Sequence, residues 1–128
     1  MPSAYEQLVK SGFVGSLKRD VLLEASVDLE YVGAIRSRFA NAGDHARREA
    51  VTCTVQLISE LIAKDLCSLA TWSKVPDSGP VVVTRSHREL ECIVAESSER
   101  DHTFEFFLLS TAAGDHWVGR YEALVGEL

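Results

Sequence analysis

Residues 44–66, DHARREAVTCTVQLISELIAKDL, have apolar residues at the spacing of one long helix, and this pattern limits the possible folds more than any other in the chain. Side chains that recur every three or four residues lie on one face of a helix, and a face of this width packs on a core. The apolar positions are Val51, Val55, Ile58, Leu61, Ile62 and Leu66. We expect Asp44 to cap the start of this helix, because its carboxylate can accept backbone N–H groups there.

The N-terminal third predicts two further helical segments. Residues 4–10 and about 17–25 form two pieces of a first helix, with Gly12 and Gly15 loosening the chain between them. A second helix is expected over about residues 29–40, with Leu29, Val32, Ile35 and Phe39 on one face. Residues 41–43, Asn-Ala-Gly, end it because Asn and Gly tolerate the left-handed cap.

The C-terminal half has β-prone segments separated by polar ones. Ser86 and Glu89 fit a capping box that opens a helix over residues 87–99, although the alternation of residues 90–95 also allows a strand. Thr111 is expected to cap a last helix over residues 112–126 that buries Trp117, Val118, Tyr121, Leu124 and Val125. Strands are predicted at residues 80–84 and 103–110, and residues 68–80 are predicted to form a loop with Trp72 as a lid on the core.

This order predicts an α+β fold of winged-helix type in a single domain, residues 1–128. Its parts are three N-terminal helices, a short β-hairpin or small antiparallel sheet, and a C-terminal helix. The length allows one core without disulfides or metal.

Three stretches carry a family resemblance: Arg47-Arg48-Glu49-Ala50, then residues 57–62 (LISELI), then the aromatic strand 106–114 (FFLLSTAAG). Together they resemble small winged-helix-like proteins that are common in actinobacteria. Asp65 stands where that family's pattern has a glycine after the long helix. The resemblance implies residues 47–64 as a recognition helix and the later strands as a wing. It also implies a bacterial protein, since some acidic members are regarded as immunity partners of secreted toxins.

The net charge of −6 is unevenly distributed along the chain. Residues 1–75 hold nine basic and nine acidic residues, whereas residues 76–128 hold four basic and ten acidic residues. An acidic surface repels nucleic acid and attracts basic proteins. We therefore expect a protein-binding module that docks a basic partner, such as a toxin domain, although a solvated face is the plainer alternative. The candidate contact residues are Glu89, Glu91, Glu96, Glu99, Asp101 and Glu105.

DNA binding by a winged-helix transcriptional regulator is the alternative function. A recognition helix presents its N-terminal residues to the bases, so arginines near the turn between the second and third helices are well placed. These are Arg36, Arg38, Arg47 and Arg48. The sequence pI of about 5.2 argues against this alternative, because most DNA-binding domains are basic.

No catalytic, cofactor or metal motif stands out in the sequence. Four histidines, at positions 45, 87, 102 and 116, lack the close spacing of metal ligands. We therefore expect no enzymatic activity, no cofactor and no metal. Cys53, Cys67 and Cys92 are expected to be reduced, buried thiols, and no signal peptide or membrane span is apparent, so a cytoplasmic monomer or homodimer is predicted.

Overall fold

The computed structural model describes residues 2–100 and 102–119. Within them it has seven helices and four strands, so the expected mixed α and β content is confirmed. The helices are α1 (Ala4–Lys10), α2 (Phe13–Val27), α3 (Val32–Ala40), α4 (Asp44–Arg48), α5 (Ala50–Ala63), α6 (His87–Glu96) and α7 (Ala112–Val118). The strands are β1 (Glu30–Tyr31), β2 (Cys67–Trp72), β3 (Pro80–Val82) and β4 (Phe106–Ser110).

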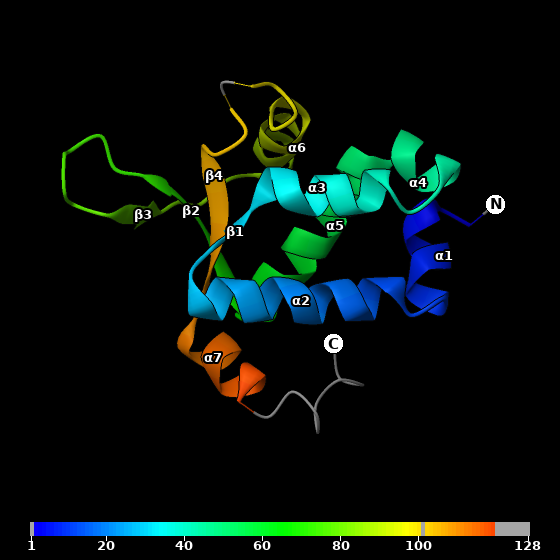
Figure 1. Ribbon diagram of the computed structural model, residues 1–128, viewed down its shortest axis with the longest axis horizontal. Coiled ribbons are helices and arrows are strands. Elements are labelled where there is room, and N and C mark those ends of the chain that lie inside the picture. Colours follow the sequence, from blue (N-terminus) through cyan, green and yellow to red (C-terminus); the bar gives the residue numbers. More distant parts are fainter. Residues whose placement is uncertain (1, 101, 120–128) are drawn as a thin grey trace.

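The four strands form one antiparallel sheet in the order β1-β4-β2-β3. One line of paired residues crosses all four strands: Tyr31, Phe107, Ala70 and Val82. Helices α2, α3 and α5 lie on one side of this sheet, α6 lies beside α3 and α5, and α7 follows the end of β4 (Figure 1). The sheet thus has one face on the helices and another turned away from them.

The core lies between the sheet and helices α2, α3 and α5. Each of these helices contributes the apolar stripe that its sequence spacing predicts, and β2 and β4 add Leu69 and Leu108 from the inner face of the sheet. The largest fully buried side chains include Leu17, Leu22, Ile35, Phe39, Leu57 and Ile58. This packing fixes α5 in the middle of the molecule, where it positions α6.

The prediction of one helix over residues 44–66 is wrong. The chain leaves helical geometry at Glu49 (φ −107°, ψ 19°), which separates α4 from α5. The Glu49 carboxylate contacts His45 and accepts a bond of 3.4 Å from the backbone N–H of Ala4, so this turn ties α4 to α1. Gly43, with φ 120°, holds the N-cap position that was expected for Asp44.

The backbone at the end of α5 explains why Asp65 can stand where a glycine was expected. Asp65 has φ 56°, in the left-handed region that glycine favours. The N–H of Leu66 donates to Leu61 O over 3.0 Å, and that of Asp65 donates to Ile62 O over 2.9 Å. These two bonds form a Schellman motif. Asp65 therefore makes the turn for which a glycine was expected.

Two strands lie in segments that were predicted to be a loop and a helix. The expected loop over residues 68–80 begins with β2, and the expected second helix starts only at Val32, because Glu30 and Tyr31 pair with β4 as β1. Trp72, expected as a core lid, is 48% exposed.

The remaining C-terminal predictions hold with shorter bounds. Ser86 and Glu89 form the expected capping box, so residues 87–96 are helix rather than strand. Thr111 caps α7 by accepting from the N–H of Gly114. Trp117 is buried as predicted, whereas Tyr121, Leu124 and Val125 lie outside the described residues. Among the described helices, none combines the length and apolar character needed to cross a bilayer.

Candidate functional site

The sequence-predicted acidic residues lie on α6 and on the loop that joins it to β4. Helix α6 buries Leu90 and Val94 against α5 and α3 and turns its other side to solvent. We call the exposed carboxylates here the acidic surface: Glu89, Glu91, Glu96, Glu99 and Glu105. The sixth candidate, Asp101, lies outside the described residues. The surface also holds Arg88 and Arg100, so its excess of negative charge is moderate.

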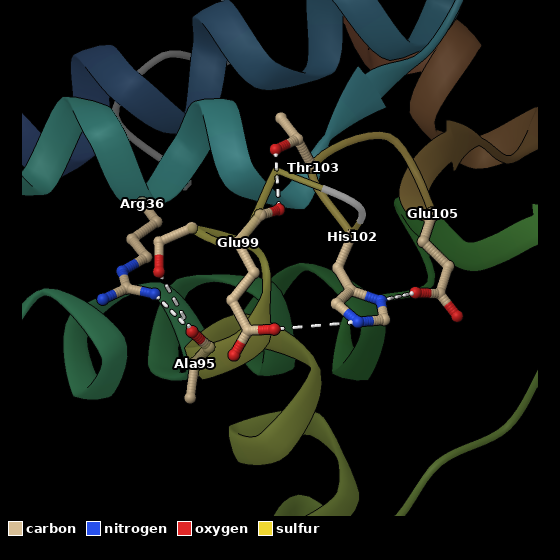
Figure 2. A network of polar contacts seen from close by, with 7 residues as sticks. Arg36, Ala95, Glu99, His102, Thr103 and Glu105 are labelled. Carbon is tan, nitrogen blue, oxygen red and sulfur yellow. Dashed lines mark hydrogen bonds and ion pairs between the residues drawn. The ribbon is translucent and has the colours of Figure 1, made fainter.

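Arg36 of α3 fixes the C-terminal end of α6. Its Nη1 donates to the carbonyl oxygens of Val94 and Ala95, at 3.0 and 2.7 Å (Figure 2). These two carbonyls belong to the last turn of α6, and the C-terminal end of a helix carries partial negative charge that attracts a guanidinium. Arg36, a candidate for DNA contact, therefore joins α3 to α6 and orients the acidic surface.

His102 holds the loop that follows α6. Its Nδ1 lies 2.6 Å from a carboxylate oxygen of Glu105 and its Nε2 lies 3.7 Å from one of Glu99, so the imidazole stands between the two acids (Figure 2). Thr103 adds a hydrogen bond of 3.0 Å from its hydroxyl to Glu99 O. The hydrogen bond to Glu105 and the nearby charges of Glu105, Glu99 and Glu96 raise the pKa of His102.

The N-terminal end of α6 carries the other two acids. Glu89 accepts from the backbone N–H of Ser86 over 3.0 Å, and this bond, together with that from the Ser86 side chain, lowers the pKa of the Glu89 carboxyl. Glu91 lies 2.9 Å from Nε2 of His87, one turn earlier. The candidate carboxylates thus fall into two groups: Glu96, Glu99 and Glu105 near His102, and Glu89 and Glu91 at the start of α6.

Glu91 and His87 also border a groove of about 430 Å³ between α5 and α6. From α5 the groove is lined by Val51, Thr52, Val55, Gln56, Ser59, Glu60 and Ala63. Its volume is in the range of small-molecule pockets, and its lining combines apolar side chains of α5 with polar side chains of both helices.

A polar network that sequence reasoning missed ends at this groove. Lys18 on α2 lies 2.6 Å from Oε2 of Glu60 on α5, and the Tyr5 hydroxyl donates to the same oxygen over 2.5 Å. Burial alone would raise the pKa of the Glu60 carboxyl, but the hydrogen bonds from Lys18 and Tyr5 lower it below its usual value. Burial, followed by the bond to Glu60, raises the pKa of Tyr5. The network links three helices.

One sequence signal could have found Lys18. Val14, Lys18, Val21 and Ala25 follow the spacing of one helical face, and all four are buried. A lysine on an apolar face implies a buried partner, because an isolated buried ammonium is strongly disfavoured. The sequence could not identify Glu60 as that partner, since the two residues are 42 positions apart.

The other candidate DNA-contacting arginines do not form a common cluster with Arg36. Arg38 pairs with Asp20 on α2 at 3.1 Å. Arg47 lies 3.7 Å from Asp44 and donates to Ala40 O over 3.4 Å. Arg48 is exposed on α4. Helix α5, which was to be the recognition helix, contains no lysine or arginine between Ala50 and Ala63.

Among the described residues, the histidines and cysteines form neither a metal site nor a reactive buried thiol. No group of three or more His, Cys, Asp or Glu side chains within residues 2–100 and 102–119 has a metal-binding arrangement. Burial raises the pKa of Cys53 to about 11 and that of Cys67 to about 12, which makes both thiols unreactive. Cys92, expected to be buried, is exposed on the solvent side of α6 within the acidic surface.

Comparison with known proteins gives no further guide, because no family model, curated protein or solved structure matches this chain.

Proposed function

We propose that this chain is a non-enzymatic, cytoplasmic protein-binding module that docks a basic partner through the acidic surface. The observation that carries the proposal is the fixed geometry of that surface. Arg36 holds the end of α6, and His102 spans Glu99 and Glu105, while the glutamate side chains stay 63% and 45% exposed. Charges that are ordered before binding lose less entropy on association, and they steer an oppositely charged partner.

We also propose that the fold is a winged-helix variant. In that fold a strand between the first two helices pairs with the second strand of a hairpin that follows the third helix. The order β1-β4-β2 has this arrangement, with α2, α3 and α5 in the three helix positions. Strand β3 and helix α6 are then an insertion between the two hairpin strands, and the insertion carries most of the acidic surface.

The DNA-binding alternative has weaker support. In a winged helix α5 would enter the major groove, where arginine and lysine read bases and neutralise phosphates. Helix α5 has neither residue, and its exposed side borders the His87 and Glu91 side chains of α6. Arg36, Arg38 and Arg47 make contacts within the fold. A basic toxin domain, the partner that the family resemblance implies, fits the acidic surface better than DNA does.

Cys92 offers a direct test of the proposal, because its thiol is exposed in the acidic surface and the other two thiols are buried. We would label Cys92 with a photoreactive maleimide, irradiate it in lysate of the source cell with and without nuclease treatment, and identify the captured protein by mass spectrometry. The control is a Cys92→Ser chain labelled at Lys10→Cys, on α1. We expect one basic protein to be captured from Cys92 and not from position 10.

Two outcomes would overturn the proposal. Equal capture from both positions would mean that the partner does not dock on α6. Capture that is lost only after nuclease treatment, together with recovered duplex DNA, would favour the regulator.

A further inference from the structure

The face of the sheet that is turned away from the core carries a row of aromatic side chains. Alternate residues of a strand point to opposite faces, and Leu69 and Leu108 point into the core. The line Tyr31, Phe107, Ala70 and Val82 therefore points outward. We call this surface the aromatic face, and it comprises those four residues together with Trp72 and Phe104.

The rings of the aromatic face contact one another in sequence across the sheet. The ring centroids of Phe104 and Tyr31 are 4.9 Å apart, those of Tyr31 and Phe107 are 6.1 Å apart, and those of Phe107 and Trp72 are 4.7 Å apart. Phe107 is completely buried beneath its neighbours. These contacts hold the outer rings in place, so little side-chain freedom remains to be lost on binding.

Three residues of the aromatic face are exposed to solvent. Trp72 is 48% exposed, Phe104 is 62% exposed and Val82 is 61% exposed. The two rings alone leave roughly 200 Å² of aromatic surface uncovered, given the usual size of such side chains. A rigid, exposed aromatic cluster of this kind is typical of the centre of a protein interface.

We propose that a second copy of this chain covers the aromatic face, so that the protein forms a twofold homodimer. The distribution of charge places a contact between two copies on this face. The chain carries a net charge of −6, so two copies repel each other wherever carboxylates meet. The six residues of the aromatic face hold no charged side chain, and the carboxylate of the neighbouring Glu105 lies against His102 while remaining 45% exposed. A twofold contact places a surface against itself, which suits a surface without charge.

The edge of the sheet indicates that the copies meet face to face. Val83 N–H donates to Leu69 O and Ser73 N–H donates to Gly79 O, so the backbone of Pro80 and Val82 points away from β2. Proline has no N–H to donate, so Pro80 cannot form a backbone hydrogen bond to a strand that pairs with the outer edge of β3. Growth of the sheet by pairing along β3 is hindered, whereas the aromatic face is open.

The test is the molar mass of the purified full chain between about 1 and 200 µM, by light scattering and sedimentation, which covers the affinities expected of such a small patch. We expect the mass to rise with concentration from 14.1 kDa toward twice that value. Phe104→Lys and Val82→Lys, which alter exposed side chains, should each raise the dimer dissociation constant by about 10-fold or more. Val9→Lys, on α1 and 51% exposed, is the matched control and should leave it unchanged.

Tryptophan fluorescence locates the contact independently of these variants. Trp72 is half exposed and Trp117 is buried, so a dimer through the aromatic face should shift the emission to shorter wavelength as concentration rises. Circular dichroism checks that each variant is folded. A chain that stays monomeric throughout the range overturns the proposal, as does a dimer whose stability and Trp72 emission ignore Phe104→Lys and Val82→Lys.

Discussion

The Lys18 ammonium lies 2.6 Å from Oε2 of Glu60, and this pair joins α2 to α5, with Glu60 also lining the α5–α6 groove. The lysine side chain is 7% exposed and that of the glutamate 37%. Removal of one member of a buried pair is strongly destabilising, because the remaining charge loses its partner in a poorly solvated place.

We expect Glu60→Gln to lower the free energy of unfolding by about 2 kcal/mol, less than the loss for a fully buried pair because water reaches the Glu60 carboxylate. The double variant Lys18→Met with Glu60→Gln should recover much of that loss, since it removes both charges and keeps an amide oxygen that can accept from the Tyr5 hydroxyl. Urea unfolding at pH 7 measures the free energy of unfolding of the single and the double variant. A Glu60→Gln chain as stable as the wild type would show that the pair contributes nothing.

Glu30 predicts a pH dependence of opposite sign to that of most carboxylates. Burial, together with the charge of Glu24, raises its pKa from 4.5 to about 7. The folded chain thus binds a proton that the unfolded chain has lost, and stability falls as pH rises between these two values. Above pH 7 we expect the ionised carboxylate to destabilise the fold by about 3 kcal/mol, at 1.4 kcal/mol for each pH unit.

The variant that tests this is Glu30→Gln, which keeps the shape of the side chain and removes its titration. Its stability should exceed that of the wild type by about 2 to 3 kcal/mol at pH 8 and by almost nothing at pH 4. The comparison is made by urea unfolding at several pH values. Two curves that run parallel from pH 4 to pH 8 would contradict the prediction.

Local signals in the sequence were sufficient for much of the C-terminal half. The capping box at Ser86 depends on residues three positions apart, and so does the cap at Thr111, which is why both could be predicted. Strand β2 could not, because residues 68–80 contain two prolines and a glycine and were therefore predicted to form a loop. The strand exists through pairing with β4, some 40 residues later. The aromatic face was missed for the same reason.

For the candidate site, the sequence predicted which acidic residues are present but not how they are arranged. The sequence showed that acid is concentrated after residue 76, but not that His102 stands between Glu99 and Glu105. It also suggested that Arg36 and Arg47 were free to bind DNA. Both side chains donate to backbone carbonyls, at Val94, Ala95 and Ala40. Every residue has a backbone carbonyl, so such contacts cannot be recognised from residue types.

Two glycines in helices predict opposite effects of the same substitution. A Cβ on Gly114 would lie 2.0 Å from the carbonyl oxygen of Leu66, where backbone cannot move aside, whereas one on Gly15 meets nothing within 4 Å. We expect Gly114→Ala to destabilise the chain by about 3 kcal/mol or more through overpacking. Gly15→Ala should stabilise it by about 0.5 to 1 kcal/mol through helix propensity. Thermal unfolding compares them, and a Gly114→Ala chain at least as stable as the wild type would refute the close contact.

Arg36 is expected to matter for stability rather than for nucleic acid. Arg36→Met keeps the aliphatic stem but removes the donors to Val94 O and Ala95 O, and we expect a loss of about 1 to 2 kcal/mol. Amide hydrogen exchange should accelerate in residues 94–100. Arg48→Met, on the exposed part of α4, is the control and should change stability by less than about 0.5 kcal/mol. If the two variants change stability equally, the contacts of Arg36 with α6 do not stabilise the fold.

The acidic surface predicts how fast the partner captured through Cys92 associates. Glu96→Lys with Glu99→Lys reverses two exposed charges beside His102, and the association rate at low salt should fall by about 10-fold or more, with a smaller change in dissociation. Glu24→Lys with Asp28→Lys makes the same change in net charge at the end of α2 and should slow association much less. Stopped-flow measurements from low to physiological salt give both rates. If the two double variants behave alike, net charge rather than the acidic surface steers the partner, and if neither responds to salt, electrostatic docking is wrong.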